Sequence, residues 1–289
     1  MTKKPIKSAV TKELEPSFHL DKGDVLADLT EKKGTTLFLG RYPMKAVLAV
    51  LERKGFFKEA RKRQLWPLAV DLDSSAFPPL QRLQVFLREK KPNNLVMDLK
   101  IQELILKPKN LLMADVPAAS FNLLYLQWLT LQNPLLRFSP QRPPLPGQSF
   151  PGLKLGRKVV DIFEYLARIG GNDGILAYPC YFHNALLFSR AFTFLRPEKR
   201  GEVLAIRRSF RELSFVQLAW IIHLNCLRTG GGEIYEWKAE EQVHPMNKVL
   251  KNHFVSKEFR DRVREAQEKL KFWVDWDCYK KKKVPESSR

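Results

Sequence analysis

The chain has 289 residues, 44% of them apolar and 11% aromatic, which is enough for one large core or for a main domain with a smaller companion. Its formal net charge is +19, and about +11 remains when the lysine-rich ends, residues 1–12 and 280–289, are set aside. A basic body attracts anions such as nucleic acids, acidic proteins, anionic lipids and polyphosphate cofactors, without choosing among them. The sequence shows no secretory signal and no apolar run of membrane length, so we expect a cytoplasmic protein.

The three cysteines, Cys180, Cys226 and Cys278, lie far apart in the sequence and form no Cys-x-x-Cys pair. This spacing argues against a disulfide framework and against a thiolate zinc site. We therefore expect reduced thiols and no metal.

The N-terminal third divides into an arm and a small folded section. Residues 1–34 are polar and charge-rich, and we expect a flexible basic arm there. Residues 35–94 are expected to form an α+β section, in which a helix begins near Pro43 and presents lysines and arginines on its outer face. Its expected strands are residues 35–40, 68–73 and 82–87.

Residues 95–232 are expected to form the main body. Polar and apolar residues alternate over residues 95–104, which predicts a half-buried antiparallel strand. Residues 122–133 are apolar on both faces, as is typical of the central strand of a covered sheet. Prolines crowd residues 134–151 and predict a long, stiff connection.

The pattern then turns mostly helical. The expected elements are a helix at residues 156–171 closed by glycines, a strand at 174–179, a short helix from 183, a strand at 192–195, and helices at 197–213 and 214–227. Residues 233–279 are expected to be a helical C-terminal extension whose last helix starts at Ser256, and residues 280–289 a basic tail. These elements predict an α/β fold with a mixed, mostly antiparallel sheet flanked by helices.

The segment Pro151-Gly152-Leu153-Lys154-Leu155-Gly156-Arg157-Lys158 links the predicted central strand to the next helix. Together with the order of elements over residues 95–196, it resembles the cofactor half of the GNAT-type acetyltransferases. Their loop is written R/Q-x-x-G-x-G, and its glycines let backbone N–H groups approach a pyrophosphate at a helix N-terminus. Here Lys154 replaces the middle glycine and Pro151 replaces the leading Arg or Gln.

The resemblance implies acetyl-CoA or another acyl-CoA as the cofactor. The residues that it assigns to cofactor binding are Gly152, Lys154, Leu155, Gly156, Arg157, Lys158, Asn184 and Ser189. The backbone of residues 127–131 would align the thioester. The family's tyrosine acid and its glutamate base on the central strands have no counterpart at the expected places, although Tyr125 lies on that strand and Glu103 on the preceding one.

Other combinations of residues give weaker indications of a functional site. Cys180 and His183 have the spacing of two metal ligands or of a nucleophile and its base, but the sequence offers no third group, and we interpret Cys180 as a buried thiol. Trp128, Trp220 and Trp273 fall on apolar stripes and are expected in the core.

The resulting hypothesis is an acyl-CoA-dependent N-acyltransferase of unknown acceptor. The alternative is a non-catalytic binding or scaffold protein whose basic surface contacts nucleic acid or an acidic protein.

Overall fold

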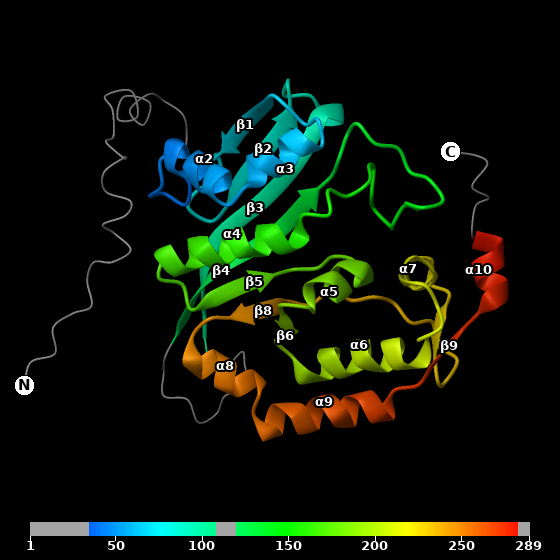
Figure 1. Ribbon diagram of the computed structural model, residues 1–289. Helices are drawn as coiled ribbons and strands as arrows, with labels where there is room; N and C mark the ends of the chain where they lie inside the picture. The colour runs from blue at the N-terminus through cyan, green and yellow to red at the C-terminus, as the bar shows by residue number, and fades with distance from the viewer. Residues whose placement is uncertain (1–34, 108–119, 283–289) are drawn as a thin grey trace, which may run out of the picture.

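The computed structural model describes residues 35–107 and 120–282, and Figure 1 shows their arrangement. The expected arm and the end of the expected tail lie outside these residues. Seven strands form the main sheet in the order β1-β2-β3-β4-β5-β8-β6. They are β1 (Leu68–Asp73), β2 (Gln81–Leu87), β3 (Leu95–Leu106), β4 (Phe121–Leu131), β5 (Gly174–Ala177), β6 (Thr193–Phe194) and β8 (Gln242–Pro245).

All neighbouring strands in this sheet are antiparallel except β4 and β5, which are parallel. The predicted fold class, a mixed and mostly antiparallel sheet flanked by helices, is therefore confirmed. β4 occupies the middle of the sheet, as its apolar residues on both faces predicted.

Helices cover the sheet on both faces. On one face, α2 (Met44–Arg53), α3 (Phe56–Lys62) and α4 (Gly156–Ile169) pack against Leu124 and Leu126 of β4. On the other, α8 (Lys248–Phe254) and α9 (Lys257–Lys269) pack against Leu123. A third apolar cluster joins the elements beyond the sheet edge, namely α5 (Phe182–Phe188), α6 (Pro197–Ser209), α7 (Phe215–His223), β7 (Leu227–Thr229), β9 (Phe272–Val274) and α10 (Trp276–Lys282).

Two expectations for the N-terminal section were wrong. Residues 35–40 form no strand but a tight turn, in which Phe38 bridges to Tyr42 and its ring is buried. The single basic helix is two helices, α2 and α3, because Gly55 between them has a φ of 74° and a helix cannot continue through that conformation. The one-turn η2 (Pro92–Asn94) then leads into β3.

The C-terminal extension was expected to be helical, and it contains two strands. β8 inserts between β5 and β6 in the main sheet, and β9 pairs with β7 in a small second sheet. Each strand is only three or four residues long, and their hydrogen-bond partners are distant in the sequence, so local periodicity carried no signal for them.

Two tryptophans expected in the core are exposed. Trp128 is 38% exposed because a bulge at Gln127, described below, moves it to the face opposite Leu126. Trp273 is 46% exposed because α9 ends at Lys269 and the apolar seam does not continue past Leu270 as helix. Trp220 is half-buried, and its indole N–H donates to the carbonyl of Pro144 at 2.9 Å.

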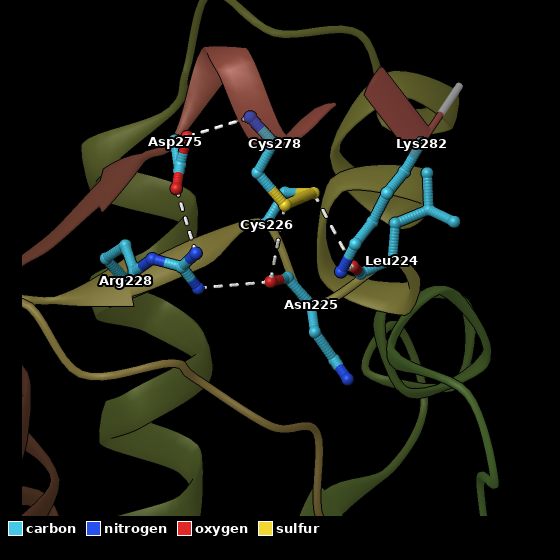
Figure 2. Close-up of a disulfide and its surroundings, with 7 residues drawn as sticks. All are labelled: Leu224, Asn225, Cys226, Arg228, Asp275, Cys278 and Lys282. Atoms are coloured by element: carbon cyan, nitrogen blue, oxygen red, sulfur yellow. Dashed lines mark hydrogen bonds and ion pairs between the residues drawn. A yellow bond between two sulfur atoms is a disulfide. The ribbon is translucent and has the colours of Figure 1, made fainter. Parts of the chain in front are cut away.

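The expectation of three reduced thiols was also wrong. Cys226 and Cys278 form a disulfide that joins the end of α7 to α10, with a Cα–Cα separation of 5.6 Å (Figure 2). Their sequence separation of 52 gave no hint of contact, but the pairing of β7 with β9 brings the two cysteines together. Cys180 remains free. No helix in the described part of the chain is long and apolar enough to cross a membrane.

Candidate functional site

β4 and β5 separate after a short parallel ladder. The ladder runs from Leu123 opposite Gly174 to Leu126 opposite Ala177, and the Tyr178 N–H adds one bond to the Leu126 carbonyl at 3.2 Å. β4 continues to Leu131, whereas the chain after β5 turns away toward α5. The two strands therefore diverge beyond Leu126, as the course of β4 and β5 in Figure 1 illustrates.

A β-bulge in β4 lies at the point of divergence. Lys100 of β3 is opposite Trp128, and the next residue, Ile101, is opposite Leu126, so Gln127 is the extra residue. Backbone groups on one side of a regular strand are an even number of residues apart. Yet the carbonyls of Leu126 and Leu131, five residues apart, both point away from β3, toward Tyr178 and Leu153 respectively. The bulge accounts for this change of phase.

After the bulge, the backbone of Leu129 is directed into the gap between β4 and β5. The N–H of Gln132 donates to Val96 of β3 at 3.0 Å, so even-numbered residues after the bulge face β3. The backbone of Leu129 consequently faces the opposite side, between the β4 carbonyls of Leu126 and Leu131 that accept hydrogen bonds from the N–H groups of Tyr178 and Leu153. This is the stretch, residues 127–131, that the sequence resemblance implied for thioester alignment.

The proline-rich connection returns to the end of β4. Asn133 N–H donates to the Pro151 carbonyl at 2.8 Å, and Leu153 N–H donates to the Leu131 carbonyl at 3.3 Å. Gly152 forms a bridge with Gln132 within this return. The predicted glycine loop is thereby held beside β4 and leads directly into α4.

The N-terminus of α4 is open. No side chain caps it, its first turn carries no acidic residue, and a Cβ at Gly156 would meet no atom within 4 Å. Lys154 and Arg157 are exposed beside it, and Leu155 is buried in the core beneath. Free N–H groups at a helix N-terminus favour an anion.

Lys158 does not share this arrangement. Its ammonium group donates to the carbonyl of Lys54 at 3.3 Å, at the C-terminal end of α2. That contact satisfies one of the carbonyls that the end of α2 leaves without a helical partner. The structure therefore gives Lys158 a role in joining α2 to α4.

The two candidates on α5 differ in their environment. Asn184 is half-exposed in the first turn of α5. Ser189 caps the other end of this short helix, and its hydroxyl donates to the Leu186 carbonyl at 2.8 Å. Neither is brought to the α4 N-terminus by a hydrogen bond that the described residues show.

Glu103 is held by other residues. Its carboxylate forms an ion pair with Arg41 and accepts a hydrogen bond from the Asn172 side chain at 3.0 Å. These contacts lie opposite Leu124, near the start of the parallel ladder rather than at the gap. A carboxylate with two donors is a poor acceptor for a substrate proton, so these surroundings do not suit Glu103 to act as a general base.

Tyr125 has a different environment. It lies two residues before the bulge, and burial, followed by the nearby charge of Glu241, raises its pKa to about 12. Tyr178 and Cys180 also contribute to this shift, so these groups lie close to the Tyr125 phenol. The phenol therefore stays protonated at neutral pH and has a proton to donate. Sequence reasoning noted Tyr125 on the central strand but gave it no role, because the family's tyrosine comes from a later helix.

Cys180 and His183 line one cavity of 350 Å³ beyond the carboxyl end of β5. Burial raises the pKa of the Cys180 thiol, which disfavours the thiolate that a nucleophile needs. In the part of the chain that is described, no group of three or more His, Cys, Asp or Glu side chains is arranged to hold a metal ion.

Comparison with known proteins gives little further information. No protein family and no curated protein matches the sequence. Among solved structures, AtaT complexed with acetyl-methionyl-tRNAfMet is similar over 51% of this chain and 74% of that chain, with 11% sequence identity and a TM-score of 0.26. The assignment of the fold class therefore rests on the strand order and register given above.

Proposed function

We propose that the chain is an acyl-CoA-dependent N-acyltransferase. The observation that carries the proposal is the divergence of β4 and β5 at a bulge, which turns the Leu129 peptide into the gap beside an open helix N-terminus. The segment that leads into this helix N-terminus, residues 151–158, carries the partial glycine-loop pattern. A hydrogen-bonding strand edge and an anion-binding helix end on one side of a sheet suit a long ligand with a polyphosphate at one end.

Each part of the site has a distinct task in this proposal. Acyl-CoA supplies the acyl group, activated as a thioester. The free N–H groups of the first turn of α4, with Lys154 and Arg157, hold the phosphates. The Leu129 N–H orients and polarises the thioester carbonyl.

The chemical step is an acyl transfer from sulfur to nitrogen. The acceptor amine forms the new C–N bond, the C–S bond breaks, and the Tyr125 phenol gives its proton to the departing thiolate. Solvent removes the proton of the amine and reprotonates the phenol. Orientation of the two reactants contributes much of the acceleration, so the chemistry does not require a carboxylate base.

The test is a calorimetric titration of acetyl-CoA into the purified protein and into two variants, Gly156→Glu and Gly156→Gln. The two substitutions add side chains of similar size, but only the glutamate places a negative charge beside the helix N-terminus. Saturable binding to the wild type that Gly156→Glu weakens at least roughly tenfold more than Gly156→Gln supports the proposal. No binding to the wild type at millimolar acetyl-CoA rejects it.

The second candidate is a binding protein for nucleic acid. The observation in its favour is an exposed ring on the basic section: Trp66 is 44% exposed, and the guanidinium of Arg61 lies 4.2 Å from the ring centroid. Such a pair is suited to stacking on an unpaired base. Against it, Arg61 and its neighbours Lys62 and Arg63 are already paired with Glu52 or Glu59. Retention on single-stranded RNA that falls steeply with salt, together with no acetyl-CoA binding, would favour this candidate.

A further inference from the structure

The cavity beyond β5 is walled by segments from three parts of the chain. These three parts are the turn after β5 with the start of α5, the segment of α7 and Asn225, and the pair Glu236 and Trp237; Pro146 of the proline-rich connection adds a fourth. Six of the eleven lining residues lie outside the segment, residues 95–196, that resembles the acetyltransferases, and five, including His183, lie within it.

His183 is the unusual residue of this cavity. Its side chain is only 3% exposed, it lines the cavity, and neither ring nitrogen has a hydrogen-bond partner among the described residues. Burial, with a smaller effect of His223, lowers its pKa to about 4, so the ring is neutral and carries one donor and one acceptor at neutral pH. Its ring nitrogens are not among the fully buried unpartnered atoms, so they are open to the cavity, where a ligand can supply the hydrogen-bond partners that the described residues do not.

Flat rings dominate the rest of the lining. The Tyr181 ring stacks on His183 with a centroid distance of 5.3 Å and an interplanar angle of 22°, and the His223 ring lies 5.9 Å from Tyr181. The Trp237 ring is fixed by its indole N–H, which donates to the Cys180 carbonyl at 3.1 Å. Ring walls of this kind favour a planar aromatic occupant.

The charges select against ionic occupants. Among the described residues no lysine or arginine lines the cavity, so none of them offers a phosphate a counter-charge there. A cation is disfavoured as well, because the Lys199 ammonium already lies 4.2 Å from the centroid of the Trp237 ring. The carboxylate of Glu236 is then available to accept a hydrogen bond from an amino group.

We propose that this cavity binds a neutral heteroaromatic base with a ring nitrogen and an exocyclic amino group, of the adenine type. His183 hydrogen-bonds the ring nitrogen, Glu236 accepts from the amino group, and the rings of Tyr181 and Trp237 enclose the base. The base can belong to a free nucleoside or to the nucleotide end of a cofactor. The inference does not rest on the acyltransferase proposal, because it holds whether or not the base belongs to acyl-CoA.

The test uses adenosine as the probe, with the full chain, in ligand-observed NMR and calorimetry. Variant His183→Leu keeps the volume of the ring but removes both nitrogens, and we expect it to weaken adenosine binding roughly tenfold. Because the change breaks no hydrogen bond between described residues, its melting temperature should stay close to that of the wild type. The matched control is His253→Leu, since His253 is a partly buried histidine with an unpartnered nitrogen that does not line the cavity.

Each outcome decides the inference. Adenosine binding that His183→Leu weakens and His253→Leu does not supports it. No adenosine binding at millimolar concentration, or equal binding to the wild type and His183→Leu, overturns it. If adenosine and acetyl-CoA compete, the base belongs to the cofactor. If both bind at the same time, the base belongs to a separate ligand. Adenosine binding without acetyl-CoA binding keeps this site and rejects the acyltransferase.

Discussion

Lys154 has a φ of 56°, in the left-handed region that glycine adopts readily and other residues adopt at a cost. It stands where the acetyltransferase loop carries its middle glycine. The backbone therefore has the shape that the family's glycine would allow, although this chain places a lysine there. Lys154 differs from the glycine of the acetyltransferase loop in its side chain, which adds a cation beside the α4 N-terminus.

This leads to a prediction about stability. Lys154→Gly and Lys154→Ala both remove the ammonium group, but only the glycine removes the Cβ that disfavours this φ. We expect the free energy of unfolding of Lys154→Gly to exceed that of Lys154→Ala by up to about 1 kcal/mol, after the greater entropy of the unfolded glycine chain is included. Urea denaturation measures both. A less stable glycine variant would show that Lys154 does not hold this conformation.

The role of Tyr125 gives a kinetic prediction. Replacing it with Phe removes the proton donor and leaves the ring, so kcat for thiol release from acetyl-CoA, in the presence of an acceptor amine, should fall roughly 100-fold or more. KM for acetyl-CoA should change little. Tyr178→Phe is the control, because Tyr178 is the more exposed neighbour of the same phenol. Equal rates for Tyr125→Phe and the wild type would remove Tyr125 from the mechanism.

At the scale of elements, the contact between α6 and α9 depends on one glycine. A Cβ at Gly201 of α6 would lie 2.6 Å from the Ala266 Cβ and 2.6 Å from the Val263 carbonyl oxygen, both on α9. Because backbone atoms form part of this contact, the helices must move apart to accept any side chain. α6 also carries Lys199, whose ammonium donates to Glu202 at 2.6 Å and lies 4.2 Å from the ring centroid of Trp237, a residue of the cavity.

We therefore expect Gly201→Ala to lower the free energy of unfolding by roughly 1–3 kcal/mol through overpacking. Gly156→Ala in the first turn of α4 is the matched substitution in open space, and it should leave stability unchanged or raise it by up to about 1 kcal/mol. Thermal and chemical denaturation compare the two variants. Equal effects would mean that α6 and α9 are not packed as closely as described.

On the scale of the whole molecule, the disulfide ties the C-terminal helix to the cavity wall. Cys226 follows Asn225, which lines the cavity, and Asp275 receives hydrogen bonds from the Arg228 guanidinium at 2.8 Å and from the Cys278 N–H at 2.9 Å (Figure 2). The backbone bond and then the Arg228 interaction hold the pKa of Asp275 below its ordinary value. The Cys226–Cys278 disulfide thus joins two segments that these hydrogen bonds already hold together.

Cys278→Ser should lower the free energy of unfolding by about 2–4 kcal/mol under oxidising conditions, since the bridge closes a long loop. Under reducing conditions the variant and the wild type should be nearly equal in stability, which provides the control. Alkylation of the denatured, unreduced protein followed by mass spectrometry counts the free thiols. Three alkylated cysteines would contradict the disulfide and restore the expectation of reduced thiols.

The sequence by itself determined the fold class and the central place of β4, because two-faced burial and alternation are properties of neighbouring residues. It also located the loop that leads into α4 and the start of α7 at Ser214, where the structure shows the hydroxyl capping the helix by accepting from the Gln217 N–H at 3.2 Å. These features depend on local geometry, which a short stretch of sequence encodes. Localisation to the cytoplasm stays a prediction.

Only the tertiary structure decided which side chains meet. The bulge at Gln127 reversed the exposure of Trp128 and turned Leu129 into the gap, and a one-residue change of strand phase leaves no mark in an apolar sequence. The disulfide, the insertion of β8 and the cavity around His183 all join residues distant along the chain. Such contacts depend on the path of the backbone in space, and periodicity and spacing do not carry that information.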